Sequence, residues 1–452
     1  MNSLERRAVI SISSIMGLRM IGLFMVLPVF TLYAASLQGS TSFLVGIALG
    51  VYGLTQAMFQ IPFGSLSDRF GRKPIILLGL IIFIVGSLIA GFAHSITWMI
   101  IGRALQGAGA VGSTMLAMIA DLTTEDQRTK AMAIAGITIG FSFSVAMFVG
   151  PVLIKWLPVN GLFFLAVGFG LLGILLLFTA TPTPKHVVWH RDAEPELRSF
   201  LKLLRSPELM KLNVGILILH AIFTASFVTI PISLLKFAGL AVSQQWFIYL
   251  PTLFVAFAVS LVFIGLAERK QQVKPYFIGG IVALALSELL LWSTPHNMIF
   301  IVLGLSLFFG GFSLLEAFMP SLVSRTAPAA RKGSALGIYS CSQFLGIFVG
   351  GVLGGWLYGQ FSFAGVYLFC TALALFWLIL ALLMQPPRYL VTQMWPTKTS
   401  NWDSIAEKLR VIPGIVEVTF IAEDGVAYLK MERATAKNPD LIRIKEQCIS
   451  IN

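Results

Sequence analysis

The chain has 452 residues, of which 57% are hydrophobic and only 12% are charged. Soluble globular proteins carry about twice that share of charged residues, and the mean hydropathy here is +0.87. Too little polar surface remains to cover a water-soluble body of this length. The composition therefore excludes an ordinary soluble protein and indicates a membrane protein with several spanning helices.

The first 181 residues contain six apolar runs, each long enough to cross a bilayer as a helix, since a span needs about 20 mainly apolar residues. The first run follows Glu5-Arg6-Arg7 and is too long for the core of a signal peptide, so we expect it to be retained. The six runs are 8–34, 42–66, 74–93, 97–120, 130–156 and 161–181. They predict an N-terminal six-helix bundle over 1–181.

A loop rich in glycine and arginine joins the second and third runs, and it includes Gly64, Asp68, Arg69, Gly71, Arg72 and Lys73. The glycines permit a tight turn. Asp68 ends the second helix with a negative charge, which can pair with Arg72 or face the positive N-terminus of another helix. The alternative is that the basic residues of this loop serve only to orient the chain in the membrane.

Charges and proline inside the first six runs mark further candidate residues. Arg19 lies in the middle of the first run, and a charge within a membrane helix usually faces a cavity or a partner. Arg103 lies in the fourth run near its outer end, so it could instead extend outward as an anchor. Gly150-Pro151 lies in the fifth run, where proline removes a backbone hydrogen bond and can kink the helix.

A polar linker over 182–208 precedes a second set of six runs, which predicts a C-terminal bundle over 209–385. These runs are 209–236, 244–267, 274–293, 297–323, 333–358 and 362–385. Glu316, His220 and Glu288 lie inside them. Glu316 is our first candidate for a proton carrier, because a carboxyl in apolar surroundings holds a proton more readily. His220 titrates near neutrality by nature. The alternative for each is a hydrogen bond between helices.

The composition changes at Pro386, and 386–452 reads as a small soluble domain of βαββα order, close to a ferredoxin-like unit. Expected elements are strands at 389–395, 416–420 and 426–431, and helices at 403–411 and 439–449. Metal-binding domains of this kind hold the ion through paired cysteines. The three cysteines of the chain form no Cys-x-x-Cys pair. We therefore expect no metal, no cofactor and a structural or regulatory role.

Basic residues fix the orientation of the helices, because they concentrate in cytoplasmic loops. The loops on the opposite side carry only Lys155 and Lys236. Both termini and the linker are therefore predicted to be cytoplasmic, and the excess positive charge faces anionic lipid rather than nucleic acid. The loops of the first side carry Arg6, Arg7, Arg69, Arg72, Lys73, Arg128, Lys130, Lys185, Arg191, Arg198, Lys202, Arg205, Lys211, Arg269, Lys270, Lys274, Arg325, Arg331 and Lys332.

The loop at 64–74 resembles the signature loop of the major facilitator superfamily at every defined position. The segment 103–110 resembles the second motif of that family, and Gly150-Pro151 resembles the core of its antiporter motif. Ala146 and Ile154-Lys155 depart from that third motif, which weakens the indication of proton-driven export. Together with Leu315-Glu316-Ala317 and the C-terminal pattern, these segments resemble the bacterial YajR-type transporters, which are similar to drug:proton antiporters.

This resemblance implies a twelve-helix major facilitator fold, made of two six-helix bundles with a small C-terminal α+β ferredoxin-like domain. It implies that Asp68 and Arg72 form a cluster with Asp121, which latches the two halves in one access state with Asp68 near Gly333. It also implies a monomeric, non-enzymatic protein of the bacterial inner membrane that exchanges protons for small organic or multidrug-type compounds.

Two other functions remain open at this stage. One is a facilitator or proton-coupled importer of a small metabolite, which the direction of flux would distinguish. The other is a membrane sensor that reads a ligand through its C-terminal domain, and deleting 386–452 would distinguish it. An enzyme is disfavoured, because the sequence contains no nucleophile elbow, phosphate loop or histidine-rich metal motif.

Overall fold

The computed structural model describes residues 1–183, 203–294, 297–328, 331–385, 390–396, 402–421 and 426–432, with a few single positions beyond. The linker segment 184–202 and most of the helix predicted at 439–449 lie outside these residues.

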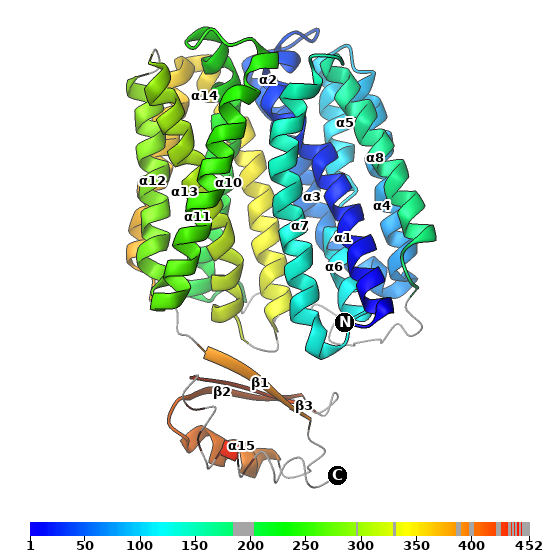
Figure 1. Ribbon diagram of the computed structural model, residues 1–452, viewed down its shortest axis with the longest axis vertical. Coiled ribbons are helices and arrows are strands. Elements are labelled where there is room, and N and C mark those ends of the chain that lie inside the picture. Colours follow the sequence, from blue (N-terminus) through cyan, green and yellow to red (C-terminus); the bar gives the residue numbers. More distant parts are fainter. Residues whose placement is uncertain are drawn as a thin grey trace.

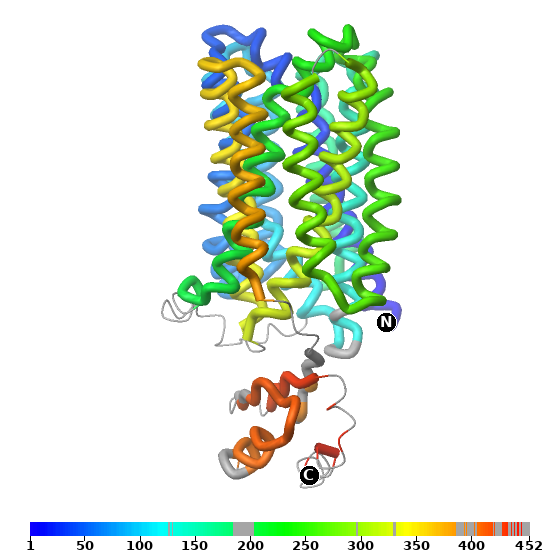
Figure 2. The backbone as a smooth tube through the Cα atoms, turned by 90° about the vertical axis from the view of Figure 1, so that its left-hand side faces the viewer, coloured from blue at the N-terminus to red at the C-terminus, as the bar shows by residue number. Residues whose placement is uncertain are grey.

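Long helices make up most of the molecule, and a small sheet domain lies beyond one end of them (Figure 1). Figure 2 shows the same arrangement from the side, and the chain's N-terminus lies at the end that faces this domain. We call this end of the helices the domain end and the opposite one the far end. The N-terminal bundle consists of α1 (Ser3–Phe24), α2 (Leu27–Ala35), α3 (Ser42–Phe70), α4 (Arg72–Gly91), α5 (Ile96–Ala108), α6 (Gly112–Asp121), α7 (Glu125–Leu153) and α8 (Val159–Thr179).

The C-terminal bundle repeats this pattern with fewer, longer helices. It consists of α10 (Pro207–Lys236), the short 3₁₀ helix η2 (Val242–Gln244), α11 (Trp246–Lys270), α12 (Val273–Ser293), α13 (Met298–Thr326) and α14 (Lys332–Leu382). Ser362 interrupts α14 with a φ of 58° and a ψ of −150°. At 1.5 Å per residue, the 51 residues of α14 would extend about 77 Å, far beyond the ~30 Å hydrocarbon core of a bilayer. The chain therefore crosses twice here, before and after Ser362.

Ten helical segments of the described chain are long and apolar enough to cross a membrane. The segment α14 is one of these ten but crosses twice, and α5 and α6 together supply one more crossing. The described residues thus contain the twelve crossings that the sequence predicts.

Two of the crossings are broken where the sequence predicted continuous helices. The first breaks between α1 and α2, because Pro28 has no N–H to donate to the Phe24 carbonyl. The fourth breaks between α5 and α6, where Gly109 and Gly112 lower the helix propensity. Hydropathy alone did not reveal either break, since both lie inside continuous apolar runs.

The two bundles meet closely at the far end. α3 and α14 touch through glycines, and a Cβ added to Gly351 would lie 2.5 Å from the carbonyl oxygen of Gly46. Small residues of this kind let membrane helices approach each other. Thr31 Oγ1 donates to the Phe227 carbonyl at 3.0 Å, and Lys155 Nζ lies 4.9 Å from the centre of the Trp246 ring. These contacts close the far end between the bundles.

The domain end differs, because there the N-terminal bundle has an apolar cluster of its own. This cluster includes Ile12, Phe63, Met118 and Leu177, all from the N-terminal bundle, whereas the main apolar core contains residues of both bundles. A Cβ added at Gly333, near the start of α14, would meet nothing within 4 Å. The bundles are thus joined in the middle and at the far end, and they separate toward the domain end.

The C-terminal domain contains a three-stranded antiparallel sheet of order β1-β3-β2, formed by β1 (Leu390–Pro396), β2 (Ile415–Ile421) and β3 (Val426–Glu432). Helix α15 (Trp402–Val411) packs on the sheet through a core that contains Trp395, Leu409 and Leu429. The βαββ order agrees with the sequence prediction. Lys430 Nζ donates to the Arg325 and Ala327 carbonyls at 2.6 and 2.9 Å, so the domain contacts the end of α13.

Candidate functional site

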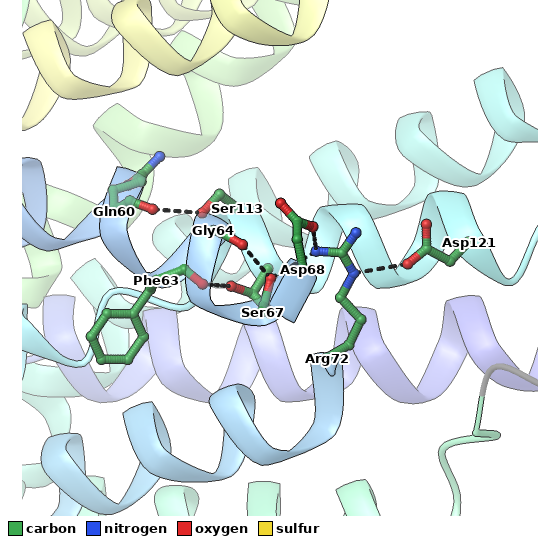
Figure 3. A network of polar contacts seen from close by, with 9 residues as sticks. Gln60, Phe63, Gly64, Ser67, Asp68, Arg72, Ser113 and Asp121 are labelled. Carbon is green, nitrogen blue, oxygen red and sulfur yellow. Dashed lines mark hydrogen bonds and ion pairs between the residues drawn. The ribbon is translucent and has the colours of Figure 1, made fainter. Parts of the chain in front are cut away.

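The loop between α3 and α4 holds an ion-pair cluster at the domain end, drawn in Figure 3. The Arg72 guanidinium lies between Asp68 and Asp121, and its Nε donates to Asp121 Oδ2 at 2.8 Å. Its Nη1 donates to Asp68 Oδ1 and, at 2.7 Å, to Ser67 Oγ. Arg72 therefore ties the ends of α3 and α6 to the start of α4.

Glycine is required at one position of this turn. Gly71 is the single residue between the end of α3 and the start of α4, and its φ of +90° is one that glycine adopts readily. Lys73 Nζ donates to the Thr181 carbonyl at 2.7 Å, which anchors the loop to the end of the sixth crossing. Arg69 is exposed, and Gly64 faces Ser113. The structure thus brings Asp68, Arg72 and Asp121 together and leaves Arg69 outside the cluster.

A second polar cluster lies about midway along the helices of the C-terminal bundle and joins three of them. Gln343 Nε2, from α14, lies 2.9 Å from Glu316 Oε1 of α13 and 3.0 Å from His220 Nε2 of α10. His220 Nε2 lies 3.8 Å from Glu316 Oε2. The side chain of Glu316 is 35% exposed, whereas that of His220 is 8% exposed. One amide group therefore donates to both the carboxylate and the imidazole.

The hydrogen bonds around His220 fit a neutral ring. Its Nδ1 lies 3.3 Å from the Ile216 carbonyl, which can only accept a hydrogen bond, so Nδ1 carries the proton. Nε2 is then free to accept from Gln343. A second proton on the ring would break this bond and turn an Nε2–H toward Glu316. The cluster can therefore hold a proton on either Glu316 or His220.

The two arginines predicted within the membrane lie elsewhere, in the N-terminal bundle. Arg19 is 3% exposed, and its Nη2 donates to Gln56 Oε1 at 3.2 Å. Arg103 is 2% exposed and donates to Gln106, with its guanidinium 4.4 Å from the centre of the Tyr52 ring. Arg103 does not extend outward to the membrane surface, because its aromatic neighbours hold it inside the bundle.

Aromatic side chains connect the bundles beside the Glu316 cluster. Phe143 of α7 lies 5.1 Å from Phe24 in its own bundle, measured between ring centres. It also lies 5.6 Å from Phe223 and 6.0 Å from Phe312 in the C-terminal bundle. Phe312 in turn lies 5.6 Å from the ring of His220. Aromatic rings from both bundles thus lie beside the titratable pair of Glu316 and His220. Ligand sites often combine an apolar lining with a few polar groups in this way.

Gly150 lies where α7 crosses the break between α1 and α2. A Cβ at this position would collide with the Met25 carbonyl, so only glycine allows this approach. Pro151 follows within the same helix. The expected kink at this point stays a prediction.

Sequence reasoning missed Gln343 and Phe143. The signal for Gln343 was a lone amide within the apolar run 333–358, while nothing distinguished Phe143 from the chain's other phenylalanines. Within the described ranges, no group of His, Cys, Asp and Glu side chains is arranged to hold a metal ion.

Comparison with known proteins shows the family and supports the fold. The family model described as Major Facilitator Superfamily matches residues 12–287 and 244–415. The chain is 42% identical over 430 residues to the "Inner membrane transport protein YajR" of Escherichia coli (strain K12), which covers 95% of this chain and 94% of that protein.

One more distant sequence match and one solved structure add to this comparison. The "Multidrug resistance protein MdtL" of Klebsiella pneumoniae (strain 342) is 27% identical over 365 residues, which cover 77% of this chain and 88% of that protein. The crystal structure of the nucleoside transporter NupG matches with a TM-score of 0.67 at 14% identity, over 84% of this chain and 100% of that chain. At this identity, the last comparison shows a common fold alone.

Proposed function

The chain belongs to the major facilitator superfamily of secondary transporters, and we propose that it exports small organic or drug-like compounds in exchange for protons. The observation that carries this proposal is the cluster of Glu316, Gln343 and His220 beside aromatic rings from both bundles. The name of the relative described as a multidrug resistance protein agrees with export.

Proton binding at this cluster would change the charge at the interface of the bundles. An ionised Glu316 needs the Gln343 donor and water, whereas a neutral Glu316 can be enclosed between the bundles at lower cost. In this structure the far end is closed, and the Glu316 side chain is partly exposed. A proton bound from the far end would therefore let the cluster be enclosed and then reopen at the domain end, which is the state seen here. There the proton leaves and a compound binds, as exchange by alternating access requires.

The loop cluster of Asp68, Arg72 and Asp121 would act as a latch in this cycle. Here the Asp68 carboxylate binds Arg72, and open space surrounds Gly333 near the start of α14. When the domain end closes, Asp68 would face the positive N-terminal end of α14, an arrangement that a helix dipole stabilises.

We assign the domain end to the cytoplasm of a bacterial cell and the chain to its inner membrane. Basic residues such as Arg69, Arg128 and Lys274 lie at the helix ends that face the domain end, while Lys155 and Lys236 lie at the far end. The name of the Escherichia coli relative states an inner-membrane location for that protein.

Proton flux in proteoliposomes tests the exchange. Under an imposed pH gradient and with a panel of lipophilic and organic-anion compounds, we expect compound-dependent proton movement from the unmodified protein and none from Glu316→Gln. Glu268→Gln is the matched control, because Glu268 pairs with Arg325 at the domain end, away from the cluster. Intact proton coupling in Glu316→Gln would refute the site. Downhill uptake of a compound without proton movement would favour a facilitator.

A further inference from the structure

A second carboxyl lies inside the C-terminal bundle, at a distance from the interface between the bundles. Glu288 of α12 is 0% exposed. Its Oε1 lies 2.7 Å from Ser226 Oγ of α10, and its Oε2 is buried with no hydrogen-bond partner among the described residues. Within the part of the chain that the structure describes, no Lys, Arg or His forms an ion pair with it. A fixed negative charge in such a place would be expensive.

The hydrogen bonds at Ser226 fit a neutral Glu288. Ser226 Oγ lies 2.8 Å from the Ile222 carbonyl and 2.7 Å from Glu288 Oε1, but a hydroxyl has only one proton to donate. If Glu288 is protonated, its O–H donates to Ser226, and Ser226 donates to Ile222. If Glu288 is ionised, Ser226 must leave Ile222 to donate to the carboxylate. Only the protonated form keeps both bonds.

The titratable neighbours of Glu288 on α14 are a phenol and a thiol, which carry no charge unless they lose a proton. Tyr367 and Cys370 of α14 are its neighbours, and Cys370 Sγ lies 3.7 Å from Ser226 Oγ. Glu316 of α13 bonds to Gln343 instead. The charged residues of the adjoining helices α11 and α13 other than Glu316 lie near their domain ends, and these are Glu268, Arg269, Lys270 and Arg325.

A small pocket lies on the far-end side of Glu288, within the C-terminal bundle. Ser233 and Tyr367 line it together with apolar side chains such as Ile230, Leu291 and Leu305. The hydroxyl groups of Ser233 and Tyr367 lie 2.9 Å apart. Leu291 is about one helical turn beyond Glu288 on the same face of α12, and Tyr367 is a neighbour of Glu288, so two of the residues that line the pocket lie near the buried carboxyl.

We propose that Glu288 is a second proton-binding site, reached from the far end through Ser233 and Tyr367 and distinct from the Glu316 cluster. The proposal rests on the proposed exchange of protons. Ser226 and His220 lie on the same helix, α10. A proton bound at Glu288 and a proton bound at the Glu316 cluster would therefore act on one common helix, which the transport cycle has to move.

Infrared titration of the purified full-length protein tests this assignment without substrate. We expect the C=O stretching band of a protonated carboxylic acid to persist at neutral pH in the unmodified protein and in Glu316→Gln. The same band should be lost in Glu288→Gln. If Glu288→Gln removes no carboxylic-acid band, the proposal is wrong. This measurement needs no transport. A protonated Glu288 can therefore be detected even if the proposed proton exchange is refuted, and its absence can be detected even if the exchange is confirmed.

A second variant keeps the test valid if Glu288→Gln does not fold. Ser226→Ala retains the carboxyl but removes its hydrogen-bond acceptor, so the band should shift to higher frequency. Ser287→Ala is the control, because the hydroxyl of the neighbouring Ser287 donates to the Leu284 carbonyl of its own helix. An unshifted band in Ser226→Ala would refute the hydrogen bond on which the proposal depends.

Discussion

At the scale of single residues, the site depends on two side chains that each serve two partners. Gln343 donates to both His220 and Glu316, and Arg72 donates to both Asp68 and Asp121. A side chain that joins two titratable partners transmits a change of charge from one to the other. Replacing either of these two side chains should therefore alter transport more than replacing its neighbours.

Gln343→Leu should shift the pH dependence of transport. The ionised Glu316 would lose its amide donor, a bond of the charge-assisted kind that contributes about 1.5–3 kcal/mol, although the 35% exposure of this side chain reduces the gain. The carboxyl would then keep its proton to higher pH, so we expect the pH profile of proton-coupled flux to move upward. Ser342→Ala is the control, since the Ser342 hydroxyl donates to the Ile338 carbonyl of its own helix. A profile that does not move in Gln343→Leu would contradict this role.

Arg72→Gln should slow transport about tenfold. Charge-assisted hydrogen bonds contribute about 1.5–3 kcal/mol, and partial exposure of Asp68 and Asp121 reduces this gain. A loss of about 1.4 kcal/mol corresponds to the tenfold change. Initial rates in proteoliposomes measure it. Arg69→Gln is the matched control, because Arg69 is exposed and lies outside the cluster, and this variant should keep the transport rate of the unmodified protein. An equal loss of rate in both variants would mean that only the total charge of the loop matters.

At the scale of helices, glycine decides where the bundles can touch. The contact between α3 and α14 places Gly46 and Gly351 against each other's backbone, and any side chain there would separate the helices. Nearer the start of α14, a Cβ added at Gly337 would meet nothing within 4 Å. The same helix thus contains one glycine that packs against another helix and one that has open space beside it.

Gly351→Ala should destabilise the protein, and Gly337→Ala should not. Overpacking of a close contact typically costs about 1–3 kcal/mol, whereas alanine in an open helical position favours the helix. The melting temperature of the purified protein measures the difference. We also expect Gly351→Ala to transport more slowly, because its far end closes less tightly. Equal melting temperatures in the two variants would show that α3 and α14 do not meet as described.

At the scale of the whole molecule, charge is distributed unequally between the bundles. The described membrane interior of the N-terminal bundle holds two buried arginines, Arg19 and Arg103, whereas that of the C-terminal bundle holds the carboxyls of Glu288 and Glu316. Protonation can change the charge of a carboxyl but not readily that of a guanidinium. Protonation can therefore change the internal charge of the C-terminal bundle more readily than that of the N-terminal bundle.

Lys430→Ala should loosen the C-terminal domain from the bundle without abolishing transport. Lys430 is 6% exposed, and its ammonium bonds to the last carbonyls of α13, so the variant loses two charge-assisted bonds. Limited proteolysis should release the domain faster. Lys408→Ala, at an exposed position on α15, is the control. After deletion of 386–452, a transporter should still move its substrate, whereas a membrane sensor would lose its output.

The sequence by itself determined the membrane location, the twelve crossings, the βαββ order and the loop of Asp68 and Arg72. These features follow from runs of apolar residues, alternation along strands and a local motif, all of which are readable over short stretches. The domain boundaries at 181, 208 and 385 stay predictions, as do the roles of the candidate residues.

Only the tertiary structure decided which polar residues meet. Glu316 and His220 were both visible in the sequence, but their joint partner Gln343 comes from a third helix, and Arg19 and Arg103 lie in the other bundle. The breaks in the first and fourth crossings and the closure of the far end also depend on contacts between distant segments. Hydropathy shows that a helix is buried in apolar surroundings, but it does not show which face meets which neighbour.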